Sequence, residues 1–257
     1  MDLKLKGLNV LVTGGSSGIG AAIVQEFLNE GCNVSFCSRS KEKIDTFLAT
    51  VKNEHNAKIT VSAFNVNDTI KFSEWIKQNP DIDIFIPNVS ALSFEDTFKP
   101  NENTLSTNWD KVIEIDIVSI IKQIEIIVPY LEKSKYPAIT YMGSLASHVA
   151  TQSMPAYGAA KAAMSHYMKT LSKKLLPLNI RVNTISPGTI FVEGGFWDVM
   201  RDNRPDIFKS ILASNPMNRL GTPDEVAKAV VFISSPIASF ISGTDLIVDG
   251  NSSTYIQ

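Results

Sequence analysis

The sequence predicts an α/β fold: a single doubly wound, Rossmann-like domain, in which helices cover both faces of a seven-stranded, mostly parallel sheet. Two observations predict it. Apolar stretches of strand length alternate along the chain with helix-length patterns, as in repeated strand–helix units. Most of these strand stretches are apolar at consecutive positions, which is expected for strands that are covered on both faces.

The first half of the chain contains four expected strands and the helices that follow them. The strands are expected at 9–15 (NVLVTGG), 33–39 (NVSFCSR), 58–66 (KITVSAFNV) and 82–90 (IDIFIPNVS). The helices are expected at 19–30, 41–55 and 67–79, and, after an irregular stretch, over 108–134. Each helix is long enough to cross back over the sheet, so consecutive strands are expected to run parallel.

The second half continues the same alternation. A strand at 137–144 leads to a helix that carries Tyr157, a strand at 180–188 is followed by a helix at 223–235, and a strand at 245–250 completes the seven. No linker, low-complexity tract or repeat interrupts the pattern, so residues 1–257 are expected to form one domain. The segment from 189 to 220 departs most from the alternation, and is read as a substrate loop or lid, with a surface decoration as the alternative.

Composition narrows the class of function. Of the 257 residues, 44% are apolar and 19% are charged, and the net charge is -2. No basic patch for nucleic acid or for a membrane surface is evident. The chain has no run of about 18 apolar residues and no signal-peptide pattern, so no membrane span is expected, and the cytoplasm is the expected location.

Cysteine and histidine usage indicates neither a disulfide nor a metal site. Cys32 and Cys37 would point to opposite faces of a strand, so buried, reduced thiols are expected. The three histidines have no metal-ligand spacing with the cysteines.

A glycine-rich turn follows the first strand directly. Gly14, Gly18 and Gly20 lie between that strand and the next helix, where glycines let the backbone approach a pyrophosphate and the helix N-terminus supplies free N–H groups. The alternative is a tight strand–helix turn without a ligand.

Tyr157 and Lys161 are four residues apart in the Ala-rich stretch SMPAYGAAKAAMSHYMKTL (153–171). An ordinary amphipathic helix is one interpretation, because apolar residues recur at spacings of three and four through Leu175. Lys161 would then be a solvated or snorkelling charge. The other interpretation is a functional pair, since a nearby cation favours the phenolate.

Six motifs together resemble the short-chain dehydrogenase/reductase family over nearly the whole chain. They are TGGSSGIG (13–20), FNV (64–66), MGS (142–144), YGAAK (157–161), SPG (186–188) and SGTDLIVDG (242–250). The resemblance implies hydride transfer between a nicotinamide cofactor and a carbonyl carbon. It implies Tyr157 as general acid/base, Lys161 as its partner and ligand of the nicotinamide ribose, and Ser144 as a hydrogen-bond partner of the substrate oxygen.

The resemblance also assigns candidate sites residue by residue. The catalytic candidates are Ser144, Tyr157, Lys161 and Asp116. The cofactor-binding candidates are Gly14, Ser16, Ser17, Gly18, Ile19, Gly20, Arg39, Asn65, Val66, Asn88, Tyr157, Lys161, Pro187, Gly188 and Ile190.

The chain departs from the family pattern at several positions, and after the fourth strand it has Pro87, Asn88, Val89 and Ser90 where the family usually has Asn-Asn-Ala-Gly. Pro87 precedes Asn88 where the family usually has asparagine, so one N–H donor is missing. Asp116 stands where the family has the asparagine of its proton relay, and an ionised aspartate accepts but does not donate hydrogen bonds. Val192 replaces a threonine, which removes a cofactor contact, and Asn65 replaces an aspartate. These losses keep open a second function, a cofactor-binding sensor or structural partner with weak or no catalysis.

Cofactor choice is expected to favour NADP(H) over NAD(H). Ser38 occupies the position of the acidic residue that binds the adenosine ribose in NAD-preferring members, and Arg39 follows it. A guanidinium pairs well with a 2′-phosphate, and Ser16 offers a hydroxyl on the same side. The alternative is that Arg39 is a solvated surface charge.

The expected partners are a small-molecule ketone or alcohol and further copies of the chain. The family usually forms tetramers through the Tyr-bearing helix and the C-terminal segment, so a homotetramer is expected. Apolar residues in the 189–220 segment, Phe191, Phe196, Trp197 and Met200, are compatible with a partly apolar substrate or with packing of the lid itself.

Overall fold

The computed structural model describes residues 1–91, 109–150 and 154–254. Its centre is a seven-stranded sheet in the order β3-β2-β1-β4-β5-β6-β7, in which every pairing between described strands is parallel. The strands are β1 (Asn9–Thr13), β2 (Asn33–Ser38), β3 (Ile59–Ala63), β4 (Ile84–Ile86), β5 (Ala138–Met142), β6 (Arg181–Pro187) and β7 (Asp245–Val248). The expected parallel, Rossmann-like sheet is confirmed.

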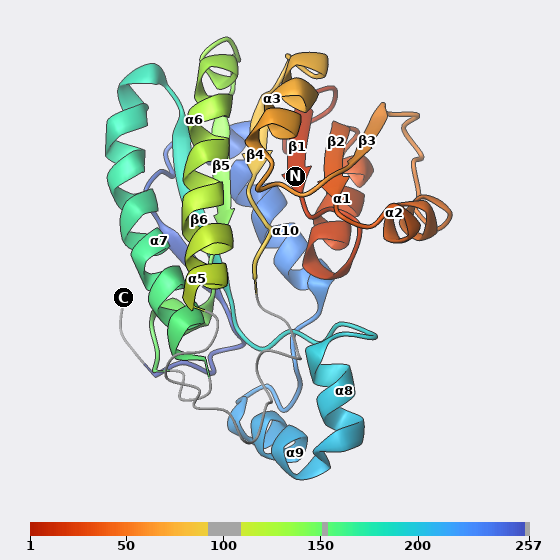
Figure 1. Cartoon of the computed structure of the whole chain (residues 1–257), viewed down its shortest axis with the longest axis vertical. Coiled ribbons are helices and arrows are strands. Elements are labelled where there is room, and N and C mark those ends of the chain that lie inside the picture. Colours follow the sequence, from red (N-terminus) through yellow and green to blue (C-terminus); the bar gives the residue numbers. More distant parts are fainter. Residues whose placement is uncertain (92–108, 151–153, 255–257) are drawn as a thin grey trace.

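Helices cover both faces of this sheet (Figure 1). On one face, α1 (Gly18–Asn29) and α10 (Pro223–Ser234) pack together over β1 and β4, and α2 (Lys41–Leu48) adds Ile44 to the same core. On the other face lie α3 (Thr69–Gln78), α6 (Ile120–Leu131) and α7 (Pro155–Leu175). Successive residues of β1 therefore belong to different cores, as strand geometry requires.

The two cysteines follow the same division. Cys32 is buried in the core beneath α1 and α10, whereas Cys37 is buried in the opposite core. Both thiols are free, as expected, and burial raises the pKa of each to about 12.

Two helices differ from the expected bounds. The helix expected over 41–55 ends at Leu48, before Thr50 and Val51, whose branched side chains have low helix propensity. The helix expected over 108–134 is divided. It consists of α5 (Trp109–Val112), a π-helical stretch η1 (Ile113–Ser119) and α6. A π-helical stretch inserted in an α-helix is frequent at functional sites, and this one carries Asp116.

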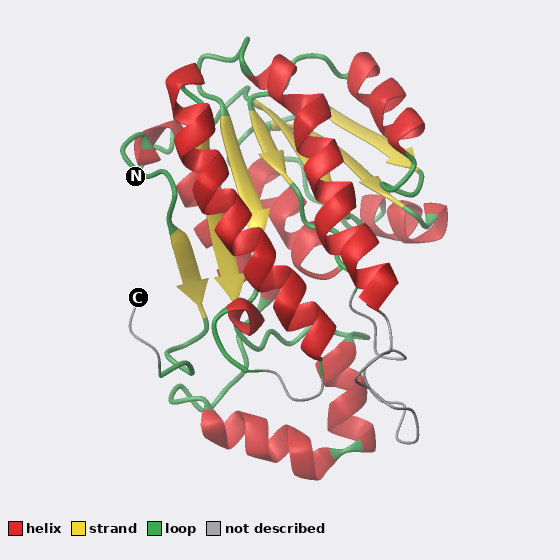
Figure 2. Cartoon of the chain, turned by 60° about the vertical axis from the view of Figure 1, so that its left-hand side comes forward, coloured by secondary structure: helices red, strands yellow, loops and turns green. Residues whose placement is uncertain are grey.

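The segment over 189–220 forms two helices of its own, α8 (Phe196–Asn203) and α9 (Pro205–Ser214). Figure 2 shows them at the end of the molecule toward which the strand arrows point. A bridge between Ile190 and Gly221 closes the base of the segment, with hydrogen bonds that use backbone groups of Thr189 and Phe191. The carboxyl ends of parallel strands are where ligands bind in open α/β sheets, and the segment lies at that end.

No helix in the described part of the chain is long and apolar enough to cross a membrane.

Candidate active site

The glycine-rich turn after β1 forms a cradle in which Gly14, Gly18 and Gly20 are poorly replaced by residues with side chains. Gly14 and Gly18 have positive φ values of 73° and 55°, which L-residues rarely adopt. A Cβ atom on Gly20 would collide with the carbonyl oxygen of Gly14. The turn lies where the strand order reverses between β1 and β4, which is the switch point at which doubly wound sheets bind ligands.

The N-terminus of α1 opens into a cleft of about 360 Å³. Ser17, the N-cap residue, makes no side-chain capping hydrogen bond, and the first turn of α1 contains no acidic residue. Its N–H groups and positive dipole are therefore available to an anion. Four of the cofactor-binding candidates, Ser16, Ser17, Ile19 and Gly20, line the cleft.

Asn88 supports the cradle from β4. Its side-chain amide donates to the carbonyl oxygens of Thr13 and Gly14, at 3.1 and 3.2 Å, and its backbone N–H donates to Thr13 Oγ1 at 3.1 Å. Asn88 also lines the cleft. It therefore fixes the glycine turn even though Pro87, beside it, has no N–H to donate.

One end of the cleft is cationic. Arg39 and Lys43 line it together with Ser16, Ser38 and Ser40, and no carboxylate is among the described residues that line it. Ser16 Oγ donates to Ser38 Oγ at 2.7 Å, and Ser40 caps α2 by accepting from the Lys43 N–H. Neither cation forms an ion pair within the described ranges. The sequence analysis did not predict Lys43 as a cleft residue. The available signal was its position: Lys43 lies in the first turn of α2, and the N-cap of that helix, Ser40, directly follows Arg39.

The remaining cofactor candidates are distributed around this cleft. Val66 lines it, and Asn65 lines a smaller hollow that it shares with Arg39. Gly188 donates its N–H to Val248 at the end of β6, and a Cβ atom there would meet Asp249. Pro187 ends β6, and Ile190 lines a separate hollow together with Asn215 and Asp249. The structure therefore brings Val66 to the cleft directly, whereas Pro187, Gly188 and Ile190 are not among the described residues that line it.

Val192 closes the cleft from the other side. It lines the cleft, and its side chain lies 3.6 Å from where a Cβ atom on Gly18 would be. The 189–220 segment thus begins against the glycine turn. Its aromatic residues pack among themselves: Phe191 packs against Phe208, and Phe196 against Trp197, while Met200 is buried.

Lys161 is buried, so the interpretation as a solvated or snorkelling charge is wrong. Its side chain is 2% exposed, and Nζ donates to the carbonyl oxygen of Met142 at 3.0 Å and to the hydroxyl of Tyr141 at 3.1 Å. Nζ also lies 5.6 Å from the centroid of the Tyr157 ring, one turn earlier on α7. The half-buried Tyr157 has no hydrogen bond from its hydroxyl to any described residue.

Asp116 reaches the same ammonium from the π-helical stretch. Its Oδ2 atom accepts the Ala91 N–H at 2.7 Å, and its Oδ1 atom lies 3.3 Å from Lys161 Nζ. That second contact has the distance of an ion pair without the angle of a hydrogen bond, so Oδ1 has no hydrogen-bond donor among the described residues.

The charge of Lys161 depends on these neighbours. Burial by itself would lower the pKa of its ammonium. The facing Tyr141, Tyr157 and Asp116 groups outweigh burial and hold that pKa above its usual value. These neighbours therefore favour the charged form of Lys161 beside Tyr157.

Ser144 lies at the end of β5 and caps the short 3₁₀ turn η2 (Leu145–Ser147), which packs against α7. Its Oγ atom accepts the Ala146 N–H at 3.1 Å. Capping uses only a lone pair of this hydroxyl. No described residue accepts the hydroxyl hydrogen, which can therefore be donated to a substrate oxygen.

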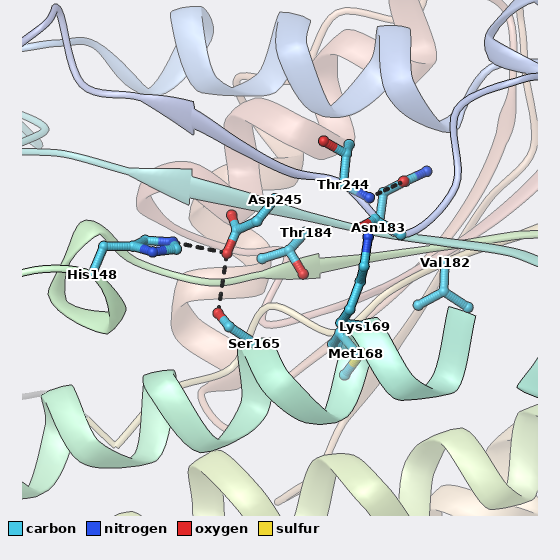
Figure 3. Close-up of a pocket in the computed structure, with 10 residues that line it drawn as sticks. His148, Ser165, Met168, Lys169, Val182, Asn183, Thr184, Thr244 and Asp245 are labelled. Carbon is cyan, nitrogen blue, oxygen red and sulfur yellow. Dashed lines mark hydrogen bonds and ion pairs between the residues drawn. The ribbon is translucent and has the colours of Figure 1, made fainter. Parts of the chain in front are cut away.

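A second cavity, of about 410 Å³, lies between α7 and β7 and shares no lining residue with the cleft (Figure 3). Asp245, which lines this cavity, interacts with three side chains. Its Oδ2 atom lies 3.0 Å from His148 Nε2 and accepts a hydrogen bond from the Ser165 hydroxyl at 3.1 Å, and its Oδ1 atom accepts one from the Ser186 hydroxyl at 2.6 Å. The cluster ties the loop that follows Ser144 to the helix that carries Tyr157 and to the last two strands.

The described residues fit a nicotinamide dinucleotide. The glycine turn and the uncapped N-terminus of α1 suit its pyrophosphate. The cationic end of the cleft suits its adenosine ribose. Lys161 and Tyr157 suit its nicotinamide end.

Comparisons with known proteins agree with this geometry. The family model described as enoyl-(acyl carrier protein) reductase matches residues 14–251. Isoepoxydon dehydrogenase patN of Penicillium expansum is 36% identical over 253 residues, which cover 96% of this chain and 95% of that protein.

Two solved structures are similar over almost the whole fold. One is an L-sorbose reductase from Gluconobacter frateurii in complex with NADPH and L-sorbose, with 25% identity, a TM-score of 0.86 and full coverage of both chains. The other is an NADPH-bound short chain oxidoreductase from Pseudomonas aeruginosa PAO1, described as containing an atypical catalytic center; it has 25% identity and a TM-score of 0.85 and covers 98% of this chain and 100% of that one. The chain therefore belongs to the short-chain dehydrogenase/reductase family and is an NAD(P)-dependent oxidoreductase.

Proposed function

We propose that this protein interconverts a small-molecule ketone and the corresponding alcohol, with Tyr157 as the general acid/base and with NADP(H) preferred over NAD(H). The observation that carries the proposal is the buried Lys161 ammonium, held 5.6 Å from the centroid of the Tyr157 ring. A fixed cation at this distance favours the charge that Tyr157 carries when it has given up its proton.

A bound nicotinamide would supply a hydride to the carbonyl carbon in reduction, or take one from the alcohol carbon in oxidation. In the reducing direction, Tyr157 gives its hydroxyl proton to the carbonyl oxygen, and Ser144 donates a hydrogen bond to the same oxygen. Lys161 stabilises the resulting phenolate. In the oxidising direction the phenolate takes the proton from the alcohol.

The preference for NADP(H) is supported by the cationic end of the cleft. Arg39 and Lys43 have no carboxylate partner in the described part of the chain, and Ser16, Ser38 and Ser40 add hydroxyl groups beside them. A 2′-phosphate at this end would gain charge-assisted hydrogen bonds. The NADPH complexes of the two similar structures agree with this preference.

The assembly is proposed to be a homotetramer in the cytoplasm. Ala162 and Ala163 are exposed on α7 and would permit close approach of a second helix. Phe232 is exposed on α10, Leu246 is exposed on β7, and Phe240 is exposed in the segment between them. Reduced, buried thiols fit a reducing compartment.

A cofactor-binding protein without effective catalysis is the second candidate, and one observation favours it. The Asp116 carboxylate offsets part of the Lys161 charge on which the phenolate depends. The two candidates are separated by comparing cofactor binding with turnover. NADPH oxidation is followed at 340 nm with a panel of cyclic ketones, sugars, steroids and 3-oxoacyl thioesters. Turnover of any of them supports the enzyme; tight NADPH binding without turnover across the panel supports the second candidate.

A further inference from the structure

Tyr141 places a buried hydroxyl against the lysine of the proposed catalytic pair. It lies on β5 and is fully buried, its ring centroid is 4.9 Å from Lys161 Nζ, and its hydroxyl oxygen is 3.1 Å from the same atom. Burial raises the pKa of Tyr141 to about 12, against the opposing effect of Lys161. Tyr141 is therefore a neutral hydrogen-bond acceptor for Lys161 rather than a second acid or base.

The ammonium of Lys161 contacts three oxygen atoms: a backbone carbonyl, a tyrosine hydroxyl and a carboxylate. An ammonium has three N–H donors. Nζ donates to the Met142 carbonyl at 3.0 Å and to the Tyr141 hydroxyl at 3.1 Å, and Asp116 Oδ1 lies 3.3 Å away without the geometry of a hydrogen bond. The contact with the Asp116 side chain is the longest of the three. In a buried site, opposite charges attract strongly, so an ammonium without other restraints would close this distance.

We propose that Tyr141 is a positioning residue: by accepting a hydrogen bond from Lys161, its hydroxyl keeps the ammonium from closing onto Asp116 and leaves its charge facing Tyr157. The inference rests on the proposed role of Tyr157. It also accounts for the Oδ1 atom of Asp116, which has no hydrogen-bond donor among the described residues and which a direct Lys161 hydrogen bond would otherwise satisfy.

Other charged groups are less well placed to produce this effect. After burial, the groups that act on the pKa of Lys161 are Tyr141, Tyr157 and Asp116. The elements packed against α7 carry further titratable or charged residues, which are Asp110 and Lys111 on α5, Glu114 on η1, His148 beyond η2 and Arg181 on β6.

The test is the ionisation of Tyr157 in the cofactor-free protein. Absorbance of tyrosinate at 295 nm is titrated for the parent and for Tyr157→Phe, and the difference between the two curves isolates Tyr157. The same pair of curves is recorded with Tyr141→Phe added. Without the Tyr141 hydroxyl, Lys161 moves toward Asp116 and supports the phenolate less, so the Tyr157 midpoint should rise by roughly 0.5–1 pH unit, the effect of one net hydrogen bond.

A double-mutant cycle with Asp116→Asn then identifies the cause. With no carboxylate to move toward, Tyr141→Phe should no longer raise the midpoint. An unchanged midpoint in the Tyr141→Phe protein, or an equal rise with and without Asp116, would overturn the proposal. Tyr167→Phe is the matched control, because its hydroxyl is on the same helix and Glu125 is the charged group that acts on its pKa; it should leave the midpoint in place.

Two further measurements keep the outcomes separate. Thermal unfolding shows whether Tyr141→Phe is folded; if it is not, Asp116→Asn alone must lower the midpoint, and a constant midpoint there would sink the proposal. The titration requires neither cofactor nor substrate. Full turnover by Tyr157→Phe would therefore defeat the proposed function while leaving the result on Tyr141 intact.

Discussion

The Oδ1 atom of Asp116 lies 3.3 Å from the Nζ atom of Lys161, and neither side chain is more than 2% exposed. The pair joins the π-helical stretch to α7 directly beside Tyr157. A buried carboxylate so close to the lysine offsets part of the charge that the phenolate needs. The pH dependence of the reaction should therefore report on Asp116.

Asp116→Asn should move the basic limb of the pH–rate profile for ketone reduction to lower pH. Removing the negative charge leaves more of the Lys161 charge to stabilise the phenolate, so Tyr157 loses its proton, and the enzyme its acid, at a lower pH. The measurement is kcat/KM against pH with saturating NADPH. Glu114→Gln, an exposed position in the same π-helical stretch, should leave the profile where it is. Superimposable profiles for parent and Asp116→Asn would show that Asp116 is uncoupled from the chemistry.

Arg39→Ala should weaken NADP(H) binding by about 1.5–3 kcal/mol, the range for hydrogen bonds to charged groups, and should change NAD(H) binding little. Lys43→Ala should weaken NADP(H) in the same direction, because Lys43 lines the same end of the cleft. Calorimetric titration with each cofactor measures the effect.

Lys41→Ala is the control for these two variants, since Lys41 pairs with Asp45 on the surface of α2 and does not line the cleft. Equal losses for NADP(H) and NAD(H) in Arg39→Ala would mean that Arg39 does not read the phosphate. A higher kcat/KM of the parent for NAD(H) would remove the preference itself.

Light scattering at micromolar concentration should give four times the chain mass of 28.2 kDa. The exposed alanines on α7 and the fully exposed Phe240 near β7 offer surface for contacts between copies of the chain. A monomer under these conditions would contradict the proposed assembly.

The N-terminus of α10 should lose stability in acid. Arg219, followed by the N–H of Thr222, lowers the pKa of Glu225 to about 2 from an ordinary value of 4.5. Its stabilising effect is therefore fully present above pH 4.5 and is lost as pH falls toward 2. The Glu225 side chain is 41% exposed, so solvent screening limits the effect at neutral pH to about 0.5–1 kcal/mol.

Urea unfolding of the parent and of Glu225→Gln checks this pH dependence. The difference in unfolding free energy between the two proteins should be larger at pH 7 than at pH 3. A difference that is the same at both pH values would show that the Glu225 charge contributes nothing.

Periodicity was sufficient to predict the sheet and the glycine cradle. Most strands are short, apolar and bounded by turn residues. Gly14, Gly18 and Gly20 lie in the turn after β1 and in the first residues of α1. Such patterns depend on residues that are close together in the chain, so they can be recognised from the sequence alone.

The environment of Lys161 was less accessible to sequence reasoning. The hydroxyl of Tyr141 and the carbonyl of Met142 reach Lys161 from twenty and nineteen residues away, across the packing of α7 on β5. Nothing in the strand AITYM distinguishes a tyrosine that contacts a lysine from one that fills a core. The π-helical stretch likewise carries an ordinary helical pattern, so the exact direction of the Asp116 side chain depends on tertiary packing.

The most direct test of the account is the turnover of Tyr157→Phe with NADPH and a ketone that the parent reduces. The substitution keeps the ring beside Lys161 and removes only the proton that the account assigns to the reaction. The account predicts that kcat falls by roughly 10²-fold or more while the protein remains folded and binds NADPH as the parent does. A folded Tyr157→Phe protein with kcat within a few-fold of the parent would contradict it.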